Sequence, residues 1–262
     1  NPRVVELNEE TLANADLATI ERVYRELFKD AAGATLRIVG NVEPETIKPM
    51  IEKYIGSIAK GKKASKVNKA NNISIAKGII DENVAIPMET PKSTVLQVYT
   101  AYMPIDTKTE VTLEIAKYVL DMIYTKTIRE EEGGTYGVGV AMVGQRTPQE
   151  RVIIQASFDT NPEQAPKLCE LAIKGLKELA ENGPDEEKFN MAIENFKKNI
   201  PESRISNSYW QSAIGLNLKH GIDYDAEYEA ALAEVTVEDI KALMQAVLAQ
   251  DNFIQIMLAP QE

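Results

Sequence analysis

The sequence has 262 residues, of which 44% are hydrophobic and 26% are charged. These fractions are typical of a folded globular protein and exclude a disordered or collagen-like chain. The length suits one large domain, or one domain with a fragment of another. The 29 basic residues are outnumbered by 40 acidic residues, and the net charge of −11 argues against a nucleic-acid-binding surface. No apolar run is long enough to predict a transmembrane helix, and residues 1–10 lack the apolar core of a signal peptide.

A single histidine, His220, and a single cysteine, Cys169, restrict the chemistry that this sequence can supply alone. Zinc sites take most of their ligands from several histidine and cysteine side chains, so we expect no zinc site within this chain. Cys169 cannot form a disulfide within the chain, and its apolar neighbours favour a buried, unreactive thiol. His220 is expected at an exposed helix end, and Trp210 in the core.

In chain order, the sequence first predicts an amphipathic helix over residues 18–29, a strand over 34–40, and a second helix from Pro44 to Gly56. Apolar residues at three- and four-residue steps indicate the first helix, and proline is tolerated in the first turn of the second. Residues 60–69 then contain five lysines and no acidic residue. A solvated linker explains this segment better than an anion-binding patch, so we place a domain boundary there.

The central part of the chain combines strands with one long helix. The helix is predicted over residues 106–128, and the last two strands flank a connection that is typical of an antiparallel hairpin. The predicted strands are 73–80, 84–88, 93–103, 135–144 and 151–160.

The remaining sequence is mainly helical. Prolines and acidic residues mark helix starts near 162 and 184, and Thr236 is a predicted N-cap. The predicted elements are helices over 161–180, from 183–187 onward, over 203–219, 225–233 and 236–249, and a strand over 253–258. Strands gathered before a run of helices predict the α+β class, with an antiparallel sheet that helices cover on one face.

A weak internal repeat links the two ends of the chain. The apolar pattern of the helix at 18–29 recurs in the helix at 236–249 at a constant offset of 220 residues, and an alternating strand follows each helix. Any two amphipathic helices share such spacing, so the helices alone prove little. Together with the strands, the repeat predicts that residues 1–70 hold only the tail of a preceding domain.

The segment from Arg129 to Tyr136 carries the clearest chemical signal. Arg129 is predicted at the helix end and Tyr136 on the strand that follows, with Gly133 and Gly134 permitting a sharp reversal between them. A guanidinium group and a phenol could then converge on one sheet edge, where they suit binding a peptide carbonyl or stabilising an oxyanion. The plainer interpretation is an arginine that caps the helix and a tyrosine that packs in the sheet.

The pattern Arg-Glu-x-x-Gly-x-x-Tyr, entered from a helix and followed by an alternating strand, resembles the C-terminal half of the M16 metallopeptidases of the pitrilysin and insulysin type. Arg129, Gly133 and Tyr136 match it at the family spacing. Residues 28–58 are also similar to the family, above all the Gly-Asn-Val-Glu-Pro-Glu segment at 40–45.

This resemblance implies an enzyme in which a zinc-binding N-terminal half and a C-terminal half together enclose a peptide substrate. In the family, His-x-x-Glu-His and a distant glutamate hold the zinc, and the glutamate of the motif is the general base. The resemblance assigns substrate binding and transition-state stabilisation to Arg129 and Tyr136, and the turn to Gly133 and Gly134. Residues 1–70 would end one M16-like domain, and 71–262 would form a complete C-terminal one.

The sequence departs from the family pattern because it lacks His-x-x-Glu-His. We therefore expect no proteolysis by this chain alone, and expect the zinc in the N-terminal half or in a partner subunit. Two alternatives remain open, namely a non-catalytic M16-like subunit or scaffold, and a free-standing peptide-binding module. A sequence with one cysteine suits either the cytoplasm or a bacterial periplasm.

Overall fold

The computed structural model describes residues 5–61, 74 and 76–261. Its contacts divide the chain into two compact units, a first unit of residues 1–75 and a second unit of residues 76–262. Most of the predicted lysine-rich linker at 60–69 lies outside the described residues.

The first unit consists of helices without a described sheet. These helices are α1 (Glu9–Ala13), α2 (Leu17–Leu27) and α3 (Pro44–Tyr54), so both predicted helices are confirmed. The strand predicted over 34–40 is wrong, because no described residue there is in a strand and Leu36 and Ile38 are exposed. A strand needs a neighbour to bond with its backbone groups, and the first unit offers no described strand as that neighbour.

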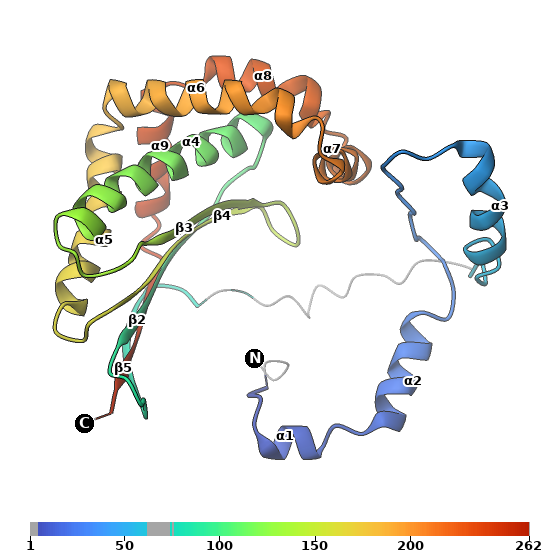
Figure 1. The fold of residues 1–262 in the computed structure, drawn as a ribbon, viewed down its shortest axis with the longest axis horizontal. Coiled ribbons are helices and arrows are strands. Elements are labelled where there is room, and N and C mark those ends of the chain that lie inside the picture. The colour runs from blue at the N-terminus through green and yellow to red at the C-terminus, as the bar shows by residue number, and fades with distance from the viewer. Residues whose placement is uncertain (1–4, 62–73, 75, 262) are drawn as a thin grey trace. The chain divides into compact units, whose positions relative to one another are not determined.

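A five-stranded sheet forms the centre of the second unit (Figure 1). Its order is β1-β5-β2-β4-β3, and its strands are β1 (Ile79–Ile86), β2 (Ser93–Tyr102), β3 (Gly139–Gln145), β4 (Arg151–Thr160) and β5 (Phe253–Pro260). The pairs β2–β4, β2–β5 and β3–β4 are antiparallel, as predicted. The pair β1–β5 at one edge is parallel, which the long intervening chain permits. The strands predicted at 73–80 and 84–88 meet in the single strand β1, which begins only at Ile79 and runs through the gap between them. The described residues before Ile79 are not in a strand, so the first of these predictions begins too early.

Helices cover one face of this sheet (Figure 1). The long predicted helix at 106–128 is α4 (Thr107–Tyr124), which continues into the π-helical segment η2 (Thr125–Glu130). The other helices are α5 (Ala165–Asn182), α6 (Glu186–Ser203), α7 (Asn207–His220), α8 (Tyr224–Glu234) and α9 (Val237–Leu248). The α+β class with helices on one sheet face is therefore confirmed.

The hydrophobic core lies between the sheet and these helices. Residues 93–99 of β2 and the residues of β4 alternate between buried and more exposed, because successive side chains of a strand point to opposite faces. The largest fully buried side chains of the core include Leu113, Ile115, Leu120, Ile154, Leu168, Leu176, Ile240 and Met244.

Three single residues also have predicted roles, namely a helix cap, a buried thiol and a core tryptophan. Thr236 caps α9 in a reciprocal capping box with Asp239, as predicted. Cys169 is buried and burial raises the pKa of its thiol to about 11. Trp210 is only half-buried, and its indole Nε1 donates to the Arg204 carbonyl at 2.8 Å.

Within the described part of the chain, no helix is both long and apolar enough to cross a membrane.

Candidate functional site

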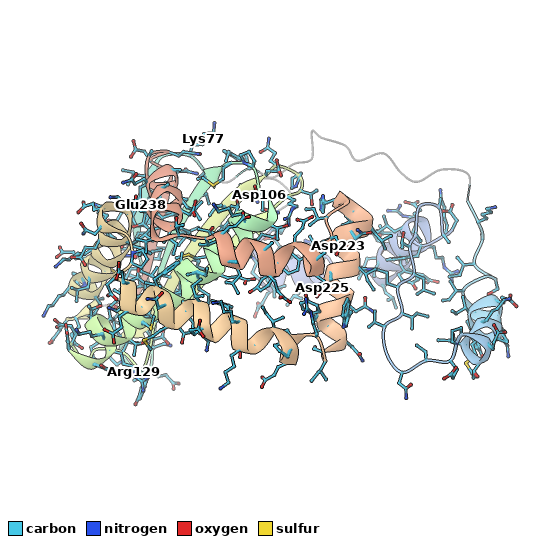
Figure 2. The ribbon with its side chains drawn as sticks, turned by 90° about the horizontal axis from the view of Figure 1, so that it is seen from above. Lys77, Asp106, Arg129, Asp223, Asp225 and Glu238 are labelled. Carbon is cyan, nitrogen blue, oxygen red and sulfur yellow. The ribbon has the colours of Figure 1, made fainter. Side chains whose placement is uncertain are left out.

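Arg129 lies in the last turn of η2, at the end of the helical run that α4 begins. Its side chain is exposed, and no carboxylate of the described residues forms an ion pair with it. Figure 2 shows Arg129 at the periphery of the second unit. The guanidinium group is therefore free to meet a ligand or another part of the protein.

Gly133 and Gly134 turn the chain from η2 toward β3, and each is a glycine for a different reason. Gly133 has φ +61°, in the left-handed region that other residues rarely adopt. Gly134 approaches α5 so closely that an added Cβ would lie 2.8 Å from Cδ1 of Leu168. The Thr160 hydroxyl donates to the Gly134 carbonyl at 2.6 Å and fixes the turn to the end of β4.

Tyr136 is not on a strand, so the predicted strand over 135–144 begins too early. The structure starts β3 at Gly139. The Thr135 hydroxyl donates to the Gly137 carbonyl at 3.0 Å and accepts from the Gly137 N–H at 3.3 Å, which forms a local turn in place of strand pairing. Tyr136 at the tip of this turn is fully exposed.

A groove of about 580 Å³ opens beside Tyr136. Three chain segments meet there, namely the loop before β2, the η2–β3 connection and the end of β4. The lining residues are Thr90, Pro91, Lys92, Gly133, Gly134, Thr135, Tyr136, Asp159, Thr160 and Asn161. The structure thus brings Tyr136 and the two glycines together at one groove, and Arg129 is not among the residues that line it.

Lys92 and Asp159 are the charged residues that line this groove, and no sequence motif marks either of them. The Lys92 ammonium group lies 2.7 Å from Oδ2 of Asp159, and the Thr94 hydroxyl donates to Oδ1 at 2.5 Å. These hydrogen bonds, first from Lys92 and then from Thr94, lower the pKa of the Asp159 carboxyl. Thr94 and Asp159 face each other in the β2–β4 register, so only strand pairing could have revealed the cluster.

A second polar cluster lies among the helices and serves their packing. The hydroxyls of Tyr224 and Tyr228 donate to the two carboxylate oxygens of Glu114 at 3.2 and 2.8 Å, which ties α8 to α4. Burial raises the pKa of Glu114, and the charge of Glu110 raises it further, against the two tyrosine hydrogen bonds that lower it.

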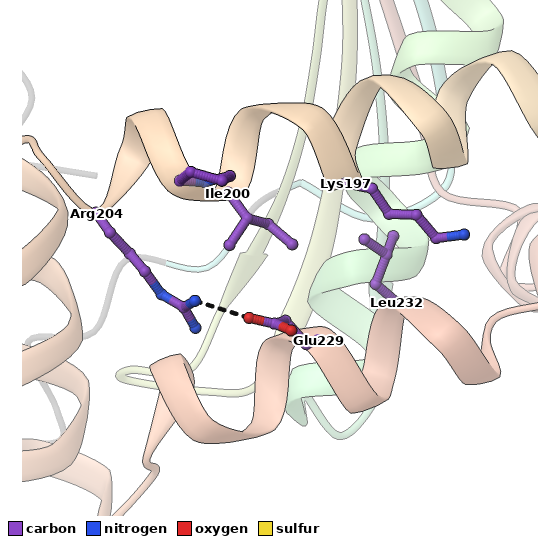
Figure 3. Close-up of a pocket in the computed structure, with 6 residues that line it drawn as sticks. Lys197, Ile200, Arg204, Glu229 and Leu232 are labelled. Carbon is purple, nitrogen blue, oxygen red and sulfur yellow. Dashed lines mark ion pairs between the residues drawn. The ribbon is translucent and has the colours of Figure 1, made fainter.

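A pocket of about 310 Å³ lies between α6 and α8, and charged residues that line it also hold helices together (Figure 3). Arg204 crosses it to pair with Glu229 at 2.7 Å and with Asp225 at 2.8 Å. Since both of its ion pairs are made within the protein, this arginine links the two helices.

The described residues do not fit a zinc site. They contain no group of three or more histidine, cysteine, aspartate or glutamate side chains placed to hold a metal ion. His220 stands at the exposed end of α7, and the Cys169 thiol is buried and protonated at neutral pH. We therefore derive no metal chemistry from this chain.

Comparisons with known proteins agree with the fold. The chain is 24% identical over 258 residues to the probable zinc protease PqqL of Escherichia coli, and 24% identical over 204 residues to a zinc protease PQQL-like protein of Arabidopsis thaliana. These alignments cover 93% and 73% of this chain, but 26% and 21% of the relatives. The chain thus spans about a quarter of the length of the curated relatives it matches.

Solved structures show the same fold. The crystal structure of the periplasmic protease PqqL from E. coli matches with a TM-score of 0.69 and 20% identity, over 85% of this chain and 25% of that one. The peptidase M16 inactive domain from Pseudomonas fluorescens matches with a TM-score of 0.67 and 17% identity. This match covers 85% of this chain and 53% of that one. The family model described as Peptidase M16 inactive domain matches residues 14–196, which is more than half of the chain. The chain therefore belongs to the M16 peptidase inactive-domain family, which occurs in zinc-protease-like proteins.

Proposed function

We propose that this chain is the non-catalytic, substrate-enclosing part of an M16 zinc peptidase. The observation that carries the proposal is the exposure of Tyr136, which the two-glycine turn and the Thr160 hydrogen bond hold beside an open groove. A tyrosine combines an apolar ring with a polar hydroxyl and is enriched at interfaces. A ligand or a facing part of a larger protein accounts for its position.

Arg129 and Tyr136 would act together on a bound peptide. The phenol donates one hydrogen bond and the guanidinium group offers five N–H donors, so both suit a peptide carbonyl. When negative charge develops on that oxygen in the transition state, the hydrogen bonds from these donors become stronger than they are in the ground state. Arg129 lies outside the groove, and we propose that the peptide extends past the rim to reach it.

The zinc would belong to an N-terminal half or to a partner subunit. His-x-x-Glu-His requires two histidines, and this chain has only His220. The proposal is supported by relatives that are about four times longer and that are described as zinc proteases. The metal would supply the activated water, while this chain would bind and orient the peptide.

The compartment is also a proposal. The E. coli relative is described as a periplasmic protease, which favours a bacterial periplasm over the cytoplasm for this chain.

A scaffold without catalytic partners is the second candidate. The family description as an inactive domain favours it. It predicts that Arg129 and Tyr136 can be replaced without loss, whereas the peptidase proposal predicts a specific defect.

The test is peptide cleavage by the complete protein that contains this chain. Tyr136→Phe and Arg129→Ala should each lower kcat/KM by roughly a hundredfold to a thousandfold, which is the range for loss of an oxyanion donor. Their melting temperatures should stay unchanged, because both side chains are exposed. Tyr102→Phe, at the end of β2 and outside the groove, is the matched control. Full activity in both variants would refute the assignment.

A further inference from the structure

The groove beside Tyr136 contains one positively charged side chain, Lys92, which is paired with one negatively charged side chain, Asp159. Lys92 lies on its rim, and its side chain is 53% exposed despite the ion pair with Asp159. An ammonium group has three N–H donors. One of them is used by Asp159, and no other hydrogen bond to a described residue is made by Lys92.

Asp159 orients this ammonium group through their ion pair. Its two carboxylate oxygens already accept from Lys92 and from Thr94. Thr94 is on β2 and Asp159 on β4, at paired positions of the sheet, so a rigid element holds the carboxylate. The arrangement leaves two of the three N–H donors of Lys92 available to a ligand.

We propose that Lys92 is a specificity-determining residue that binds a carboxylate of the peptide lying against Tyr136. The carboxylate could be an acidic side chain or the C-terminus of the peptide, since both have the same charge and geometry. This inference rests on the proposed peptide-binding function of the groove and adds a preference to it.

The effect of Lys92 is expected to be moderate. Asp159 lies within ion-pair distance and offsets part of the attraction, and half-exposed charges are screened by solvent. Loss of the ammonium group should weaken binding of an acidic peptide roughly two- to tenfold, as for ion pairs at partly exposed sites. Binding of a neutral peptide should not change.

Calorimetric titration of the complete protein, with peptides that it cannot cleave, tests the inference without requiring catalysis. Three peptides of equal length would be used, namely a neutral peptide with an amidated C-terminus, the same peptide with one Gln→Glu change, and the neutral peptide with a free C-terminus. Lys92→Gln should reduce affinity for one or both carboxylate peptides and leave the amidated neutral peptide unaffected. Which of the two loses affinity identifies the source of the carboxylate.

Lys174→Gln is the matched control, because Lys174 also forms an ion pair, with Glu178, but does not line the groove. It removes the same charge and should not alter the ratio between the affinity for each carboxylate peptide and the affinity for the amidated neutral peptide. An unchanged ratio in Lys92→Gln, or an equal loss for all three peptides, would overturn the inference.

Tyr136→Phe separates this inference from the proposed function. If that variant binds every peptide more weakly while Lys92→Gln leaves the ratio intact, only the role of Lys92 fails. If Lys92→Gln changes the ratio while Tyr136→Phe alters neither binding nor cleavage, only the role of Tyr136 fails. If none of the three peptides binds the unaltered protein, both fail.

Discussion

Gly134→Ala is the substitution that most directly tests how the fold positions the candidate site. The added Cβ would lie 2.8 Å from Cδ1 of Leu168 and 3.1 Å from Oε1 of Gln164. Carbon atoms normally stay about 3.5–4.0 Å apart, so the contact with Leu168 is too short by about an ångström. Leu168 is fully buried within the core and has no solvent to move into.

The cost follows from this geometry. Adding one carbon to a packed interior typically destabilises a protein by about 1–3 kcal/mol. For a unit of this size, each kcal/mol lowers the melting temperature by roughly 2–4 °C. Gly137 is the matched control in the same connection, because a Cβ there would meet nothing within 4 Å. Gly137→Ala should change the stability by less than about 0.5 kcal/mol.

A double-mutant cycle followed by urea unfolding identifies the clash. Leu168→Ala alone should cost about 2–5 kcal/mol, because it leaves a cavity. In the double variant the new methyl group occupies part of that cavity, so the combined loss should be at least about 0.5 kcal/mol smaller than the sum. Strict additivity, or a Gly134→Ala variant as stable as Gly137→Ala, would refute the packing argument.

Two further predictions concern titratable groups. Folding raises the pKa of Glu114 above its ordinary value of 4.5, so the folded state holds this proton more tightly and the ionised form costs stability at neutral pH. Glu114→Gln should therefore raise the melting temperature at pH 7, and the gain should shrink as the pH falls toward 4; a loss of stability at pH 7 would contradict the reasoning. Burial raises the pKa of Cys169 to about 11, so a disulfide reagent at pH 8 should label it only in denaturant, and rapid labelling of the native protein would contradict its placement.

Most of the second unit could be predicted from its sequence, because the local signals there agree with the tertiary contacts. Thr236 and Asp239 cap α9 through contacts three residues apart. The alternation of β2 matches a strand with one buried face. Asp81, Glu82 and Asn83 interrupt the apolar residues of β1 and predict a break there. The strand nevertheless continues, because it lies at a sheet edge, where polar residues are tolerated.

The parts that could not be predicted depend on residues distant in sequence. The apolar pattern at 34–40 is typical of a strand, but a strand forms only where another strand is available to pair with it. The mostly apolar residues 138–143 predict a strand that includes Tyr136, but Thr135 forms a local turn, so β3 begins only after it. Lys92 and Asp159 are 67 positions apart, so no local pattern could join them to Tyr136.

The zinc content and mass of the native protein, together with peptide cleavage by this chain alone, test the central claim most directly. We predict a polypeptide or tight complex much larger than 262 residues that carries about one zinc ion per active unit. We also predict no cleavage by this chain without the zinc-bearing part, and cleavage when that part is present. A native protein of this chain's length that binds no zinc and has no large partner would contradict the account, as would peptide cleavage by the isolated chain.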